Sequence, residues 1–220
     1  DLNFGCPAKT VNKSKGGAVL LKETQTLYDI VKAVRDAVPA EIPVSAKIRL
    51  GFEDKSLAIE NAIAITEAGA SELVVHARTK TEGYKPPAYW DWIAKIKQHT
   101  DIPLVANGEI WNAEDAQRCQ SQSECTNLMI GRGALAMPNL AMSIKEGVAP
   151  MPWSELAALL IQYSGYEIFG DKGKYYPNRI KQWCGYLKRQ YPEAEVLFND
   201  IRRLTKSQDI VDVLARQADI

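Results

Sequence analysis

The chain has 220 residues, of which 46% are apolar and 25% are charged, a composition that is typical of globular proteins and excludes a disordered or collagen-like chain. Its longest uninterrupted apolar run, residues 156–161, is far shorter than the roughly 20 residues of a transmembrane helix, and no leader pattern marks it for export, so we expect a cytoplasmic protein without a membrane partner. Four cysteines are too few for a disulfide scaffold, two histidines exclude most multi-histidine metal sites, and the balance of 27 basic and 27 acidic residues argues at first against a nucleic-acid partner.

Residues 1–146 alternate short apolar runs with amphipathic helical patterns. The short runs are apolar on both faces, as strands buried in a parallel sheet are. Gly69 follows one helical pattern as a stop signal, and Asn112 precedes another as an N-cap with acids in the first turn. The predicted strands cover residues 1–4, 44–50, 73–77, 104–107 and 128–130, and the predicted helices cover residues 24–38, 56–68, 89–98, 112–120 and 136–144.

This alternation predicts repeated βα units, which can form either an open doubly wound sheet or a (β/α)8 barrel. No Gly-x-Gly-x-x-Gly turn follows the first strand, which weakens the dinucleotide-binding form of the open sheet. The polar residues gather instead at the carboxyl ends of successive strands, where TIM barrels build their active sites. We therefore predict an α/β fold with about five of the eight βα units of a TIM barrel, and we expect about three further units before residue 1, because the chain opens in mid-strand.

After residue 150 the pattern changes to helices without strands, expected over residues 154–169, 178–190, 192–205 and 207–216. Residues 172–206 carry nine basic and three acidic residues, a net charge of +6, with four tyrosines and one tryptophan between them. Residues 9–22 add four lysines and no acid. Such a pattern suits RNA phosphates and unstacked bases, although a solvated helix face is the simpler interpretation. We predict a partial barrel over residues 1–150 and a small helical domain over residues 151–220.

Cys6 comes directly after the first predicted strand, in the segment Asp1-Leu2-Asn3-Phe4-Gly5-Cys6-Pro7. A lone cysteine is more often a small buried residue than a reactive one. Here Gly5 permits an unusual backbone turn, and Pro7 disfavours an immediate helix start. We therefore expect the thiol to project into the loops above the barrel, whereas the other three cysteines have the wrong spacing for zinc or fit a helix face.

The later strand ends carry cations, an imidazole and glycine turns. Lys47 and Arg49 alternate along their strand, so both point to the barrel interior, where a cation needs an anionic partner. His76 ends the next strand, two residues before Arg78. Glycines after the last two strands are typical of phosphate loops in barrels, and here they stand in Asn107-Gly108-Glu109 and Gly131-Arg132-Gly133.

Together, the first segment with Gly16-Gly17 and the strand-end motifs in this order resemble the tRNA-dihydrouridine synthases, most closely their bacterial C-type branch. The resemblance covers essentially the whole chain. It implies an FMN-dependent oxidoreductase that reduces the C5=C6 bond of a D-loop uridine in tRNA, with uridine 16 suggested by the branch and with NADPH as electron donor. It also implies tRNA as the partner, and we expect a monomer without a metal ion.

The resemblance also implies roles for individual residues. Cys6 would act as the general acid, which suits a thiol because it is mostly protonated near neutral pH. The base would be extruded from the RNA to reach it. The expected cofactor-binding residues are Lys47, His76, Asn107, Gly108, Glu109, Gly131 and Arg132, and the expected substrate- or tRNA-binding residues are Asn3, Arg49, Tyr84, Arg179, Lys181 and Arg203.

Two other functions stay open at this point. A flavin barrel of the dihydroorotate dehydrogenase or dihydropyrimidine type would perform related chemistry on a free base, but it would have no use for the basic helical segment. A non-catalytic RNA-binding module would use that segment but would not need Cys6.

Overall fold

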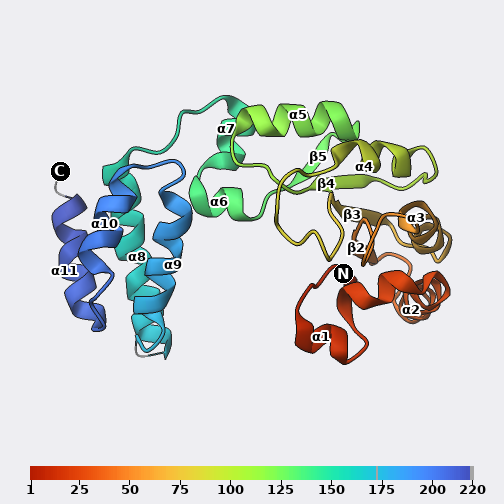
Figure 1. Cartoon of the computed structure of the whole chain (residues 1–220), viewed down its shortest axis with the longest axis horizontal. Helices are drawn as coiled ribbons and strands as arrows, with labels where there is room; N and C mark the ends of the chain where they lie inside the picture. The colour runs from red at the N-terminus through yellow and green to blue at the C-terminus, as the bar shows by residue number, and fades with distance from the viewer. Residues whose placement is uncertain (172, 219–220) are drawn as a thin grey trace. The chain divides into compact units, whose positions relative to one another are not determined.

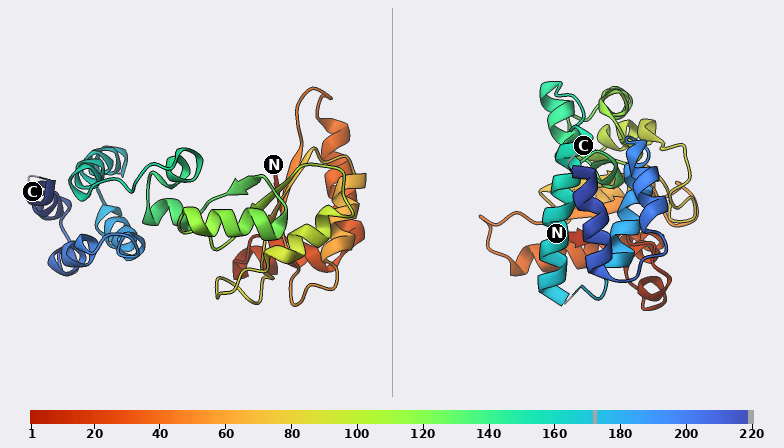
Figure 2. Two further views of the ribbon diagram at one scale, coloured as in Figure 1. Left: turned by 90° about the horizontal axis from the view of Figure 1, so that it is seen from above. Right: turned by 90° about the vertical axis from the view of Figure 1, so that its left-hand side faces the viewer.

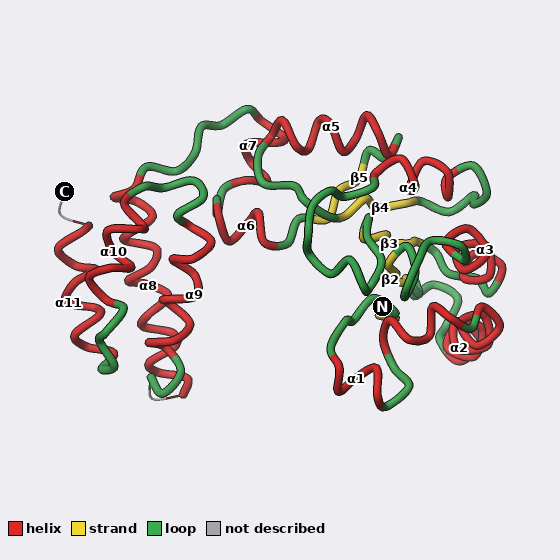
Figure 3. The backbone as a smooth tube through the Cα atoms, viewed as in Figure 1, coloured by secondary structure: helices red, strands yellow, loops and turns green. Residues whose placement is uncertain are grey.

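The computed structural model describes residues 1–171 and 173–218, so that Lys172, which the basic segment includes, lies outside the described residues. Its first part contains a sheet of parallel strands with helices along one side (Figures 1 and 3). The strands are β1 (Leu2–Asn3), β2 (Ser45–Arg49), β3 (Glu72–His76), β4 (Leu104–Asn107) and β5 (Asn127–Met129). Each lies within a few residues of its predicted position.

The sheet has the order β1-β2-β3-β4-β5, and every neighbouring pair is parallel. A parallel neighbour requires a crossover between consecutive strands, and here the crossovers carry helices. They contain α2 (Thr24–Ala37), α3 (Ala58–Glu67), α4 (Trp90–Lys97) and α5 (Ala113–Ser123). This sequential winding confirms the βα repeat and is that of part of a TIM barrel.

Alternation along β2 determines which side chains reach the site. Ala46 and Ile48 are fully buried, whereas Lys47 between them is half-buried. Because successive side chains of a strand point to opposite faces, Lys47 and Arg49 share the other face of the sheet.

Four short helices differ from the prediction. α1 (Lys9–Lys13) and the 3-10 helix η1 (Gly17–Lys22) occupy the first βα loop, and the single helix expected over residues 136–144 is wrong. The chain instead forms α6 (Arg132–Ala136) directly after the last strand, and then α7 (Leu140–Glu146). Pro138 separates them, because proline lacks an N–H group and disfavours a helical residue before it.

The helical part contains α8 (Trp153–Asp171), α9 (Tyr176–Leu187), α10 (Glu193–Ile201) and α11 (Ser207–Ala218), which run side by side in Figure 2. They surround their own apolar core, and its fully buried members include Leu160, Ile180, Leu197 and Leu214. No helix among the described residues combines the length and the apolar character that a bilayer span needs.

The chain divides into two compact units, one of residues 1–110 and 114–131, and one of residues 111–113 and 132 onward. α6 and α7 therefore group with the helical part. The expected domain boundary after residue 150 lies in the loop before α8 and stays a prediction.

Candidate active site at the carboxyl ends of the strands

Three of the predicted site residues end neighbouring strands in one row. Arg49 of β2 pairs in register with His76 of β3, and His76 pairs with Asn107 of β4. Asn3 of β1 pairs with Lys47, two residues before Arg49. The register thus brings five predicted residues to one edge of the first unit, although their roles stay predictions.

The backbone of Cys6 is held by the loop that follows it, and the residue as a whole is half-buried. The Cys6 carbonyl oxygen accepts hydrogen bonds from the Ala18 N–H at 3.0 Å and from Asn12 Nδ2 at 2.9 Å. Gly17 has a φ of +64°, and a Cβ there would lie 2.8 Å from the same oxygen. Neither Asn12 nor Gly17 was predicted to support the site. Gly17 had a signal in the sequence, because the Gly16-Gly17 pair is part of the family resemblance, whereas Asn12 had none.

Asn3 is exposed beside this loop. Its Oδ1 accepts a hydrogen bond from the Gly5 N–H at 2.9 Å, so the side chain braces the turn that precedes Cys6. Its amide Nδ2 has no hydrogen-bond partner within the described residues and can still donate to a base.

Lys47 is a half-buried cation with a perturbed proton affinity. Burial, and then the charge of Arg49, lower the pKa of its ammonium to about 8. No carboxylate or hydrogen-bond acceptor of the described residues contacts this ammonium. A desolvated ammonium is stabilised only by an anionic or electron-rich group, so its surroundings fit a negatively charged ligand.

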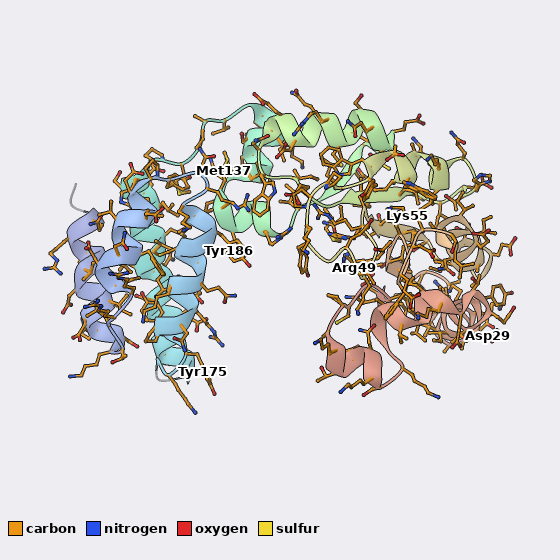
Figure 4. All side chains as sticks on the ribbon, in the orientation of Figure 1. Asp29, Arg49, Lys55, Met137, Tyr175 and Tyr186 are labelled. Atoms are coloured by element: carbon orange, nitrogen blue, oxygen red, sulfur yellow. The ribbon has the colours of Figure 1, made fainter. Side chains whose placement is uncertain are left out.

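Arg49 and His76 are buried, with exposed fractions of 4% and 6%. Both lie next to the loop that carries Tyr84, and Arg49 is labelled in Figure 4. Tyr84 is 52% exposed, and its ring stands edge-on to the His76 ring at a centroid distance of 6.1 Å. The Arg49 guanidinium carbon lies 5.3 Å from the centre of the Tyr84 ring. Tyr84 therefore presents an aromatic surface directly over two of the predicted site residues.

The Asn107-Gly108-Glu109 turn is fixed by neighbouring elements. Asn107 Nδ2 donates to the Met129 carbonyl at 2.7 Å, and Gly108 adopts a φ of +123° with its Cα facing His76 Nε2, which would lie 3.5 Å from a Cβ. The Glu109 carboxylate forms an ion pair with the fully buried Arg78. The ion pair neutralises the carboxylate, which makes the turn compatible with an anionic ligand.

Gly131 and Arg132 follow the last strand. A Cβ at Gly131 would meet no atom within 4 Å, so its backbone is open to a ligand. Arg132 begins α6 in the second unit, where its guanidinium carbon lies 5.0 Å from the Trp111 ring. Arg189 contacts the same ring at 4.0 Å, a cluster that the sequence pattern did not reveal.

The basic residues predicted to bind tRNA differ in their surroundings within the helical unit. Arg179 forms an ion pair with Glu167, and Lys181 Nζ donates to the Leu204 carbonyl at 2.6 Å. Arg203 is exposed. Tyr175, 5.5 Å from the Arg179 guanidinium, lies where α8 gives way to α9 (Figure 4).

The other cysteines are buried, as expected for structural residues. Burial raises the pKa of Cys119 and of Cys184 to about 12, and it also raises the pKa of Cys125. The described residues contain no group of three or more His, Cys, Asp or Glu side chains that could hold a metal ion.

Comparison with known proteins gives the same family by two routes, a family model and individual relatives. The family model described as dihydrouridine synthase matches residues 1–218. The chain is 56% identical over 214 residues to the tRNA-dihydrouridine(16) synthase of Shewanella oneidensis, a match that covers 97% of this chain and 68% of that protein. The enzymes of the same name from Vibrio parahaemolyticus and Shigella flexneri are 55% and 50% identical, over 100% and 96% of this chain and 68% and 67% of their own lengths.

Proposed function

The chain belongs to the dihydrouridine synthase family, and from this premise we propose that it reduces the C5=C6 bond of uridine 16 in the D-loop of tRNA. The family match confirms the resemblance seen in the sequence and the expected barrel fold. The observation that carries the proposal is the half-buried Cys6 in the loop after β1, which Arg49 of the Arg49, His76 and Asn107 row contacts through the Gly5 carbonyl. Reduction of a pyrimidine requires a proton donor and groups that stabilise negative charge, and the cations Lys47 and Arg49 lie on the same strand of this edge.

The residues at this edge fit FMN, with NADPH as its reductant. The Lys47 ammonium and the buried Arg78 Nη1 are donors suited to an electron-rich ring or a phosphate, and neither has a hydrogen-bond partner among the described residues. His76, Asn107, Gly108, Glu109, Gly131 and Arg132 are the further residues that we propose to hold it. When bound, FMN supplies the hydride that reduces C6 of the base.

The protein's own contribution to the chemistry is a proton. The Cys6 thiol donates it to C5 of the uracil, so that the base gains one hydride and one proton and the double bond becomes single. The thiolate that remains belongs to a loop that Arg49 contacts directly, since Arg49 Nε donates to the carbonyl of the preceding residue, Gly5, at 2.9 Å. Lys47 stabilises negative charge that develops beside it.

The base must leave the RNA stack to reach this thiol. Asn3 and Tyr84 are exposed at the same edge and are suited to contact the base and its neighbours. We propose that the basic helical residues Arg179, Lys181 and Arg203 bind the tRNA backbone. A free-base dehydrogenase would not need them, which is why the helical unit favours the RNA substrate.

The proposal is tested by mapping dihydrouridine in tRNA from cells that lack the gene. We expect unmodified uridine at position 16, restored when the gene is returned. Normal dihydrouridine at position 16 in those cells contradicts the proposal, and turnover of free uracil or orotate by the pure protein with no turnover of tRNA supports the free-base alternative.

Arg203→Glu is expected to weaken tRNA binding without loss of flavin. The logarithm of the tRNA affinity falls with the logarithm of the salt concentration, and each lost phosphate contact makes this negative slope shallower by about 1. Arg203 is exposed and forms no ion pair among the described residues, so the folded structure should tolerate the change. Lys145→Glu makes the same charge change at an exposed position of α7 and serves as the control. If the salt dependence of tRNA affinity were the same for the two variants, Arg203 would not contact the tRNA phosphates.

A further inference from the structure

Arg49 joins two loops that carry functional residues. Its Nε donates to the Gly5 carbonyl at 2.9 Å, and Gly5 immediately precedes Cys6. Its Nη1 donates to the Thr79 carbonyl at 3.1 Å and to the Gly83 carbonyl at 3.0 Å, and Gly83 immediately precedes Tyr84. The guanidinium thus links the loop after β1 to the loop after β3.

The link depends on the shape of the guanidinium as well as on its charge. A guanidinium directs N–H donors along fixed lines and can satisfy several carbonyls at once, whereas a lysine ammonium is a point charge. Hydrogen bonds with a charged donor are stronger than neutral ones, and these are shielded from water because Arg49 is only 4% exposed. Arg49 could therefore not be exchanged for lysine without loosening both loops.

We propose that Arg49 is a positioning residue that fixes the Cys6 loop against the Tyr84 loop, so that the proton donor and the aromatic RNA contact are held in place by one side chain. The inference rests on the proposed function for its consequence in catalysis, but the link itself is a property of the protein alone. It differs from the base-binding role predicted for Arg49, because the donors identified here are directed at backbone carbonyls.

The alkylation rate of Cys6 by iodoacetamide measures this link without RNA or flavin. Cys119, Cys125 and Cys184 are buried, so alkylation under native conditions reports on Cys6. Arg49→Lys keeps the charge but loses the bridging geometry, and we expect alkylation at least about fivefold faster than in the wild type. An unchanged rate overturns the proposal.

Arg35→Lys is the matched control. Arg35, in the last turn of α2, also donates to three backbone carbonyls at 2.6–2.8 Å. Those carbonyls belong to Val38, Pro39 and Ile42, in the segment that follows α2 and not in either of the two loops. We expect its alkylation rate to stay within about twofold of the wild type. Equal acceleration in both variants would show a general loss of stability and would overturn the specific link.

Hydrogen exchange provides the second measurement, which remains informative if Arg49→Lys is less stable. Exchange should rise together in residues 3–8 and 79–85 and stay unchanged in β4. A rise in only one of the two loops overturns the link. In the enzyme assay we expect kcat to fall while the tRNA Kd changes little, whereas a weakened Kd with normal alkylation would show that Arg49 acts on the base. Normal dihydrouridine formation by the wild type tests the proposed function separately.

Discussion

Cys6→Ala is expected to abolish dihydrouridine formation while tRNA and flavin still bind. The substitution removes the proton donor and no hydrogen bond of the loop, because the contacts to Ala18 and Asn12 are made by the Cys6 backbone carbonyl. General acid catalysis contributes typically 10²- to 10⁴-fold, so the rate of product formation should fall by at least about 10²-fold. Nucleoside mass spectrometry of tRNA after incubation with enzyme and NADPH measures the product.

Cys125→Ala makes the same chemical change at a cysteine that is 4% exposed. It should lower stability slightly, because a buried sulfur is lost, but leave dihydrouridine formation near the wild-type level. Normal product from Cys6→Ala would show that another group or water protonates C5. A simultaneous loss of tRNA binding would instead assign Cys6 a role in holding the substrate.

The strands of this sheet were predictable because each is short and apolar on both faces. Residues 104–107 were located without error, and the ends of β2 and β3 lie within two residues of the prediction. Parallel pairing then aligned Arg49, His76 and Asn107, since the carboxyl ends of parallel strands share an edge. That alignment explains why a pattern of strand ends could predict which residues lie side by side.

The supporting contacts could not be predicted in the same way, because they join residues far apart in the sequence. Nothing near Arg78 marks Glu109 as its ion-pair partner 31 residues away, and nothing near Arg49 marks the carbonyl of Gly5. The break between α6 and α7 had a local signal in Pro138, but the apolar pattern around it was interpreted as one helix. Helical periodicity therefore concealed a turn that proline chemistry should have indicated.

Lys47→Met is expected to raise stability and lower activity at the same time. Burial and the charge of Arg49 hold the pKa of Lys47 at about 8 in the folded protein, against about 10.4 in an unfolded chain. Below pH 8 the ammonium is charged in both states, and its burial opposes folding in full. Between pH 8 and about 10.4 the unfolded chain binds more protons, so the free energy of unfolding rises with pH.

Urea unfolding of the flavin-free protein at pH 7 should therefore show Lys47→Met about 1–2 kcal/mol more stable than the wild type, less than the full shift implies because the side chain keeps some solvent contact. The advantage should shrink by pH 10. Lys55→Met is the control: this lysine pairs with Glu82 at 2.8 Å and lies 3.8 Å from the Tyr89 ring, so its loss should destabilise the protein. If both variants were less stable than the wild type, Lys47 would have a structural partner in the folded protein. If Lys47→Met were more stable and fully active, the Lys47 ammonium would have no part in the reaction. We expect a gain in stability together with a loss of dihydrouridine formation, because a buried cation without a partner in the protein destabilises the fold but can bind an anionic ligand.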